Sequence, residues 1–397
     1  MINPKYKRIE ELGWNPVLLR RAKVLVVGAG ALGNEALKNL ALLGVGHIWV
    51  ADMDIIEDHN LTRSVLFRAE DIGKPKAEAA AHRIKEINPD VKVYPITKTV
   101  QETMGLGFFF QVQVVFGCVD NVQTRLDLNR YCLQAGTLFI DAGIRKLDGD
   151  VKIFGKPYAV CFDCMVTNTM RLEAWQRHSC LKLRSHTNPD SVSTAPTIAS
   201  IMAGLQVQLG VKYLHKQPIV IGKRFAVLGY IDQMHVTKMH RNHACPTHAQ
   251  YEPIPKNQLI PLNLSSTDNT LADLLTEVKN IMGKNAVIQL DYDLVTHYTC
   301  LQHNYQTQLY RRRGTIFADE VQCPLCKQEQ QPNAHLLMQE HFINQISGNE
   351  QPQLLQKKLN QIGLPYYHIV TGFTCTDKQF QYNYFLINND KKIFTSY

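Results

Sequence analysis

Residues 23–44, KVLVVGAGALGNEALKNLALLG, decide the fold of this chain. The opening run KVLVV is apolar and rich in β-branched side chains, which is typical of a strand buried on both faces of a parallel sheet. Gly28, Gly30 and Gly33 follow it, and a helical pattern then ends at Gly44. Glycines between a strand and a helix allow close backbone approach, and a helix N-terminus favours phosphate. The stretch predicts a nucleotide-binding Rossmann-type domain.

An acidic residue closes the next strand pattern, HIWVA. Asp52 follows that pattern, where a carboxylate can accept hydrogen bonds from ribose hydroxyls. Strand and helix patterns alternate to about residue 160, which predicts an α/β fold with a doubly wound sheet. Taken alone, these features fit an NAD enzyme equally well.

Charged residues beyond Asp52 favour ATP over a nicotinamide dinucleotide. ATP concentrates charge on three phosphates and usually needs several cations and a carboxylate that holds a metal ion. Asp120, which ends the strand pattern VVFGCVD, is placed to be that carboxylate. The alternative for the cations is that they are solvated surface charges. No P-loop sequence is present, so a P-loop ATPase is excluded. The other candidates are Asp54, Asn60, Arg63 and Lys76.

Composition excludes several classes of protein. The 397 residues are 45% hydrophobic and 20% charged, and no run of 18 apolar residues predicts a membrane span. The N-terminal residues are charged where a signal peptide is apolar, so we expect a cytoplasmic protein. A net charge of +8 without a dense basic stripe argues against nucleic acid. In this compartment, closely spaced cysteines indicate metal binding rather than disulfides.

The character of the sequence changes twice after the alternating region. Residues 165–195 are polar and lack a sustained period, which indicates a functional or disordered loop. Near residue 262 a linker, YEPIPKNQLIPLNLSS, precedes a short amphipathic helix and further cysteines. We therefore expect a nucleotide-binding domain over residues 1–262 and a smaller accessory domain over residues 263–397.

Three segments, taken in order, resemble the adenylation domain shared by ubiquitin-activating enzymes and MoeB/ThiF proteins: GAGALGNEALKNLALLGVGHIWVADMDIIEDHNLTRSVLF, GKPKAEAA and VDNVQTRLDLNRYC. The resemblance implies adenylation of the C-terminal carboxylate of a ubiquitin-like protein with ATP and Mg²⁺. It implies that Asp52 holds the ribose and that Asp120 binds Mg²⁺. Arg8 would reach the ATP of the partner subunit in a homodimer, although the family carries a longer R-Y-x-R-Q segment there. The residues around the phosphates would be Asn60, Arg63 and Lys76.

The resemblance also implies a structural zinc site. MoeB-like proteins place two C-x-x-C pairs at the points where this chain has Cys161 with Cys164 and Cys245 with His248. The histidine is a departure from the family pattern, but three cysteines and one histidine form a normal zinc shell.

A second Cys/His set has the spacing of a zinc ribbon and predicts a second structural zinc. It consists of Cys300, His303, Cys323 and Cys326. The alternatives are that these residues are incidental, or that Cys323 and Cys326 complete the first site in place of Cys245 and His248.

Cys180 is the candidate nucleophile. It lies in WQRHSCLKLRSH, where the cationic neighbours lower a thiol pKa, and thioester-forming members of the family carry their nucleophile in this stretch. The alternative is a surface cysteine in a loop. With Cys180 as nucleophile, the resemblance implies a thioester and hand-over to a conjugating enzyme, in a prokaryotic pathway such as antiviral defence. The competing functions are adenylation of a sulfur-carrier protein without this thioester, and a non-catalytic nucleotide-binding scaffold.

Overall fold

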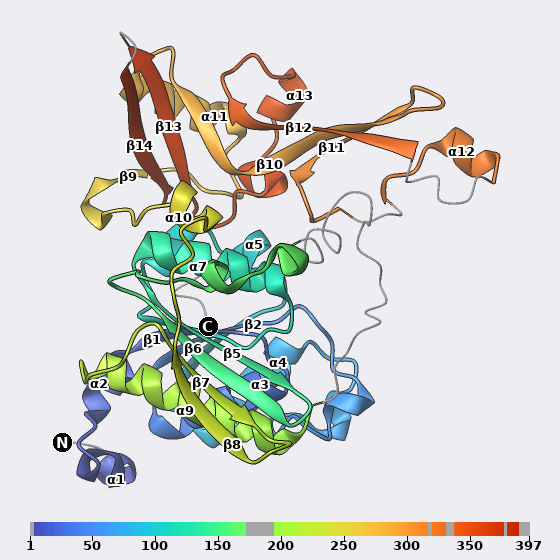
Figure 1. The fold of residues 1–397 in the computed structure, drawn as a ribbon. Helices are drawn as coiled ribbons and strands as arrows, with labels where there is room; N and C mark the ends of the chain where they lie inside the picture. Colours follow the sequence, from blue (N-terminus) through green and yellow to red (C-terminus); the bar gives the residue numbers. More distant parts are fainter. Residues whose placement is uncertain (1–3, 172–193, 317–319, 331–336, 377–378, 389–397) are drawn as a thin grey trace.

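The structure, a computed structural model, describes residues 4–171, 194–316, 320–330, 337–376 and 379–388. Its first unit is built on an eight-stranded sheet in the order β3-β2-β1-β4-β5-β6-β7-β8 (Figure 1). The strands from β3 to β5 in this order are parallel, and the remaining three join antiparallel. Their bounds are β1 (Lys23–Val27), β2 (His47–Ala51), β3 (Lys92–Ile96), β4 (Val114–Gly117), β5 (Leu138–Arg145), β6 (Asp148–Phe154), β7 (Lys223–Leu228) and β8 (Gln233–Lys238).

Helices cover both faces of this sheet. One hydrophobic cluster joins one face to α3, α4 and α9, and a second joins the other face to α5, α6 and α7. Within the described residues, no helix has the length and apolar character needed to cross a membrane. The helix bounds are α3 (Ala31–Leu43), α4 (Lys76–Ile87), α5 (Val100–Thr103), α6 (Leu106–Phe109), α7 (Val122–Ala135) and α9 (Pro196–Leu214).

The Rossmann-like α/β class predicted from the sequence is confirmed. From β1 the chain proceeds through α3 to β2 and β3, and it then returns to the other side of β1 to form β4. Ligands of doubly wound sheets bind at the carboxyl ends of the strands where this reversal occurs. The carboxyl ends of β1 and β4 are therefore where a nucleotide site is expected.

The second unit is a smaller sheet that stands over α5 and α7 (Figure 1). Its strand order is β11-β10-β13-β14-β9, and β12 pairs with β10. The expected linker contains β9, which pairs in parallel with β14 and so belongs to this second sheet. The bounds are β9 (Leu259–Leu262), α11 (Leu271–Met282), β10 (Val287–Cys300), β11 (Gln306–Arg312), α12 (Pro324–Gln328), β12 (Met338–Ile346), α13 (Pro352–Leu355), β13 (Ile369–Thr376) and β14 (Gln379–Ile387).

Close backbone contact and a buried ion pair join the two units. Gly105 donates its N–H to the carbonyl of Tyr366 at 2.9 Å, and a side chain at Gly105 would clash with His368. On α7, Arg130 forms an ion pair of 2.9 Å with Asp291 of β10, and their side chains are 9% and 19% exposed. His368 lies 3.2 Å from the same carboxylate. Burial opposes ionisation of Asp291, but Arg130 and His368 outweigh it and hold its pKa well below the usual range.

We expect Asp291→Ala to lower the free energy of unfolding by about 3–5 kcal/mol at neutral pH, because it leaves Arg130 buried without its partner. A lowered carboxylate pKa stabilises the fold above the unfolded pKa of about 4. This contribution is lost as pH falls from there through the lower folded pKa. Denaturant unfolding at several pH values measures both effects.

The matched control for this prediction is Asp293→Ala, two residues away. Asp293 pairs with Arg313 at 3.1 Å, but both side chains are about 30% exposed, so we expect a loss below about 1 kcal/mol. Equal losses for the two variants would contradict the role assigned to the Arg130–Asp291 pair.

Candidate nucleotide and metal sites

Two glycines of the first motif are required by the backbone around them. Gly28 follows β1 with φ of +95°, and a Cβ there would clash with the carbonyl oxygen of Cys118. A Cβ at Gly33 would clash with the carbonyl oxygen of Gly28. Gly30 caps the start of α3 and has open space on its Cβ side. The turn is thus packed against the residues after β4, and its helix N-terminus is left open.

Asp52 lies beside this turn, as the sequence predicts. Its Oδ2 accepts a hydrogen bond from the Ala29 N–H at 2.6 Å, and its Oδ1 accepts one from the Asp54 N–H at 2.9 Å. Burial raises the pKa of Asp52, and Lys76 partly opposes this rise. The carboxylate is therefore fixed between two backbone donors at the end of β2.

Lys76 and Asp54 form an ion pair in this structure. Nζ of Lys76 lies 2.9 Å from Oδ2 of Asp54, and the lysine side chain is only 12% exposed at the first residue of α4. A phosphate that binds Lys76 has to compete with Asp54 for the ammonium group. Lys76 is therefore a largely buried cation whose ammonium group is held by Asp54. It is not a solvated surface charge.

Asn60 and Arg63 lie on a short segment after Asp54. Asn60 is buried, and its Oδ1 accepts a hydrogen bond from the Glu57 N–H at 3.0 Å, while its carbonyl accepts one from the Arg63 N–H. Arg63 is partly exposed and forms no ion pair with any described residue. Its guanidinium is therefore available for an anion, and Asn60 contributes to the shape of the segment.

Two buried amides that the sequence analysis missed hold this region together. Asn34 donates from Nδ2 to the Ala29 carbonyl at 2.6 Å and accepts from the Leu66 N–H at 2.8 Å, so it ties the glycine turn to the Arg63 segment. Gln206 of α9 donates to the carbonyl of Gly117, the last residue of β4, and to the carbonyl of Ile140 within β5. In both cases the sequence places a polar amide on an otherwise apolar helix face, and this pattern could have indicated a buried hydrogen-bonding residue.

Asp120 is exposed, three residues after the end of β4. The preceding residues adjoin the glycine turn, because Cys118 abuts Gly28 and its N–H bonds to the Val27 carbonyl at 2.8 Å. The Asp120 carboxylate forms no hydrogen bond or ion pair within the described part of the chain. An unengaged carboxylate at this edge fits a Mg²⁺ ligand, since Mg²⁺ prefers oxygen donors and is usually held by one or two carboxylates.

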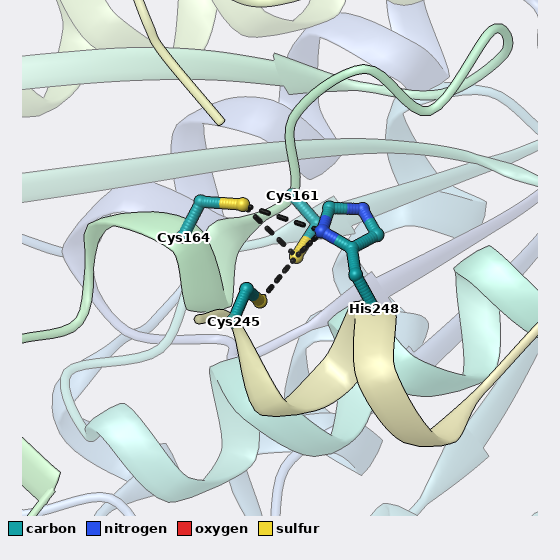
Figure 2. Close-up of side chains that lie close together, drawn as sticks. All are labelled: Cys161, Cys164, Cys245 and His248. Atoms are coloured by element: carbon teal, nitrogen blue, oxygen red, sulfur yellow. Dashed lines mark hydrogen bonds between the residues drawn. The ribbon is translucent and has the colours of Figure 1, made fainter. Parts of the chain in front are cut away.

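The first predicted zinc set is assembled in space (Figure 2). Sγ of Cys161 lies 3.8 Å from Sγ of Cys164 and 3.7 Å from Sγ of Cys245, and Cys164 lies 3.4 Å from Nδ1 of His248. Four ligands about 2.3 Å from a tetrahedral zinc are separated by about 3.8 Å, so the spacing fits zinc. These residues come from the segment after β6 and from α10 (Pro246–Gln250) and its N-cap.

Asp163, which lies between Cys161 and Cys164 in the sequence, connects the two halves of this cluster. The sequence analysis did not identify it. Its Oδ2 accepts hydrogen bonds from the Thr247 N–H at 3.1 Å and from the Thr247 hydroxyl at 2.9 Å. Its Oδ1 forms an ion pair with Arg171. The carboxylate therefore joins the two halves of the cluster independently of any metal.

The second set is also assembled, separately from the first. Sγ of Cys300 lies 3.7 Å from Sγ of Cys326, and Nδ1 of His303 lies 3.6 Å from Cys323 and 3.3 Å from Cys326. Nε2 of His303 lies 3.1 Å from Glu329, which can fix the tautomer that presents Nδ1 to a metal. Both clusters could hold zinc, and Cys323 and Cys326 do not complete the first one.

The ThiF family matches residues 15–250, which include the glycine turn, Asp120 and the first cysteine cluster. The chain belongs to the ThiF family. The resemblance read from the sequence is thereby confirmed at the level of the family.

Relatives of this ThiF-family chain include three curated enzymes. The chain is 36% identical over 147 residues to SUMO-activating enzyme subunit 2 of Dictyostelium discoideum, covering 37% of this chain and 22% of that one. It is 30% identical over 230 residues to ubiquitin-like modifier-activating enzyme 5 of the same organism, covering 53% and 56%. It is 36% identical over 154 residues to the sulfur carrier protein adenylyltransferase of Thermus thermophilus, covering 37% and 56%.

The matched part of the chain covers between 22% and 56% of the length of these three relatives. Among solved structures, it is similar to E. coli MccB crystallised with ATP, with a TM-score of 0.50 and 25% identity over 62% of this chain and 74% of that chain.

Arg8 of the ThiF-family chain lies at the other edge of the sheet from its own glycine turn. Tyr6, two residues before Arg8, donates to Asp90 at 3.0 Å, and Asp90 lies two residues before the start of β3. The glycine turn follows the end of β1, which runs parallel to its neighbours. Arg8 is exposed on α1 (Lys7–Glu11) and lies away from the glycine turn of the same chain.

The candidate nucleophile Cys180 lies outside the described residues. Of the described cysteines that belong to neither cluster, Cys118 and Cys132 are buried, and burial raises the pKa of both thiols far above the usual range. Cys375 is exposed near the end of β13. The two buried thiols are consequently unsuited to nucleophilic attack near neutral pH.

Proposed function

We propose that this chain uses ATP to adenylate the C-terminal carboxylate of a ubiquitin-like protein. The observation that carries the proposal is the convergence of the Gly28 turn, Asp52 and the strand end before Asp120 in a ThiF-family chain. Relatives named as activating enzymes and as a sulfur carrier adenylyltransferase support this substrate class, and the ATP bound in the MccB structure supports the nucleotide.

In this proposal Asp52 accepts hydrogen bonds from the ribose, and Arg63 and Lys76 neutralise the phosphates, with Asn60 and Asp54 shaping the site. Asp120 would hold Mg²⁺, and that ion would supply Lewis-acid stabilisation of phosphate charge. A carboxylate oxygen of the partner bonds to the α-phosphorus of ATP, and the bond to the bridging oxygen breaks, so that pyrophosphate leaves. Positioning and charge neutralisation suffice for this step.

Arg8 is proposed to act in the nucleotide site of a second subunit, in a homodimer. Its place at the amino-terminal edge of the sheet, away from its own glycine turn, supports action across an interface.

The finer proposal is a thioester. The Cys180 sulfur attacks the carbonyl carbon of the acyl-adenylate, AMP leaves, and the acyl group then passes to a conjugating enzyme. The second candidate is transfer to a sulfur carrier without this thioester, which the Thermus thermophilus relative favours.

We expect Cys180→Ala to retain partner-dependent ATP–pyrophosphate exchange and to lose a thioester adduct that hydroxylamine cleaves. The exchange persists because the proposed adenylation residues lie elsewhere in the chain. The test uses purified enzyme, MgATP and candidate ubiquitin-like proteins, with gel and mass-spectrometric detection, and Cys375→Ala as the control. Exchange without any adduct in the wild type would favour the sulfur-carrier function. No exchange with any such partner would favour a nucleotide-binding scaffold.

A further inference from the structure

Arg125, in the first turn of α7, forms a hydrogen bond with the backbone immediately before Asp120. Its Nη2 donates to the carbonyl oxygen of Val119 at 2.6 Å and lies 3.3 Å from the carbonyl oxygen of Ala142. The Val119 carbonyl belongs to the peptide group that leads into Asp120. This single guanidinium therefore joins the loop after β4 to the middle of β5.

A buried carboxylate holds the guanidinium in place. Nε of Arg125 lies 3.1 Å from Oδ1 of Asp141, whose side chain is fully buried, and Nζ of Lys152 lies 3.7 Å from the other carboxylate oxygen. The Arg125 side chain is 16% exposed. A charge of this kind, paired and largely desolvated, has far less freedom than a surface arginine.

The same side chain also lies against Phe162, the residue that follows Cys161 of the first cysteine cluster. The guanidinium lies over the ring of Phe162, 5.9 Å from its centroid, and Phe162 directly follows Cys161. The Phe162 N–H donates to Asn129, one helical turn after Arg125 on α7. Arg125 thus lies between the cysteine knuckle and the loop that presents Asp120.

We propose that Arg125 is a positioning residue for the metal-binding carboxylate of Asp120, an inference that rests on the proposed function. By fixing the peptide plane between Val119 and Asp120, Arg125 sets the direction of the exposed Asp120 carboxylate, which itself has no side-chain partner in the described part of the chain. Residues that orient a metal ligand typically contribute 10–100-fold to metal affinity.

Isothermal titration of ATP with and without Mg²⁺ tests this inference without a protein partner. Arg125→Lys keeps a cation beside Asp141 but cannot also reach the two carbonyl groups, and Arg125→Gln removes the charge. We expect the Mg²⁺-dependent gain in ATP affinity to fall by about tenfold or more in Arg125→Lys. In Arg125→Lys, ATP affinity without Mg²⁺, zinc content and melting temperature should remain near those of the wild type, whereas Arg125→Gln removes the arginine charge that pairs with the fully buried Asp141 and should lower the melting temperature.

The control is Arg224→Gln, because Arg224 pairs with Asp150 in the same charge network without touching the Asp120 loop. A wild-type Mg²⁺ gain in Arg125→Lys and Arg125→Gln, together with a lost gain in Asp120→Ala, would overturn the role of Arg125 alone. Absence of any Mg²⁺ gain in the wild-type protein would overturn the metal assignment and this inference together. Equal losses of ATP affinity with and without Mg²⁺ would assign Arg125 a merely structural role.

Discussion

Asp120→Ala should reduce partner-dependent ATP–pyrophosphate exchange by about a hundred- to a thousandfold. A Lewis acid at transferring phosphate contributes several kcal/mol to transition-state stabilisation, and each 1.4 kcal/mol is about a factor of ten in rate. Asp120 is exposed at the carboxyl edge of β4, so its truncation leaves no cavity and no buried unpaired charge. The loss should therefore appear in exchange kinetics and not in the melting temperature.

Two variants sharpen this test. Glu277→Ala, which removes an exposed carboxylate from α11 in the second unit, should exchange at the wild-type rate. Asp120→Asn preserves the shape of the side chain but weakens metal binding, so it should lie closer to alanine than to the wild type. Exchange at the wild-type rate in Asp120→Ala would refute the metal assignment.

The nucleotide half of the site was predictable because its signals are local. The turn at Gly28 and Gly33 follows from a strand–glycine–helix pattern within a few residues, and the structure shows the backbone approach that excludes larger side chains there. Asp52 could be placed for the same reason, since it ends the next strand and meets the turn through Ala29.

The contacts that orient the site were not predictable in this way, because they join residues far apart in the chain. Asn34 bonds to Leu66, and Gln206 bonds to residues of β4 and β5 from a helix whose sequence is otherwise mostly apolar. Arg130 and Asp291 pair across the two units, 161 positions apart. Neither periodicity nor residue spacing carries such information, and the same holds for β9, whose short apolar run resembled a linker.

The cysteine clusters could be predicted from the sequence only in part. Each pair is visible locally as two ligands separated by two residues, but which pairs combine depends on the fold. The structure separates the two sets, with Cys161 and Cys245 in one and Cys300 and Cys326 in the other. The alternative combination across the two units is thereby removed.

The purified chain should contain two equivalents of zinc, and Cys161→Ser and Cys323→Ser should each remove one, with different consequences. Structural zinc contributes about 10–16 kcal/mol of apparent binding free energy in zinc-finger peptides, so its loss far exceeds the effect of an ordinary core substitution. The first cluster is linked to α7 through Phe162, whose N–H bonds to Asn129, and we expect loss of the first zinc to destabilise the first unit and abolish ATP binding.

The second cluster sits in a small separate core, so its loss should remain local. That core has few large apolar members, among them Val295, Tyr298 and Ile316, and too small a core usually needs a metal to persist. Cys323→Ser should therefore disorder the end of β10 and α12 and leave ATP affinity unchanged.

These outcomes are measured by metal analysis, titration calorimetry with MgATP and limited proteolysis. The control is Cys375→Ser, which changes an exposed cysteine outside both clusters and should keep both zinc ions. A single equivalent of zinc that survives Cys323→Ser would eliminate the second site. Loss of ATP binding in Cys323→Ser would mean that the two units unfold together, because the interface around Arg130 and Asp291 then transmits the damage.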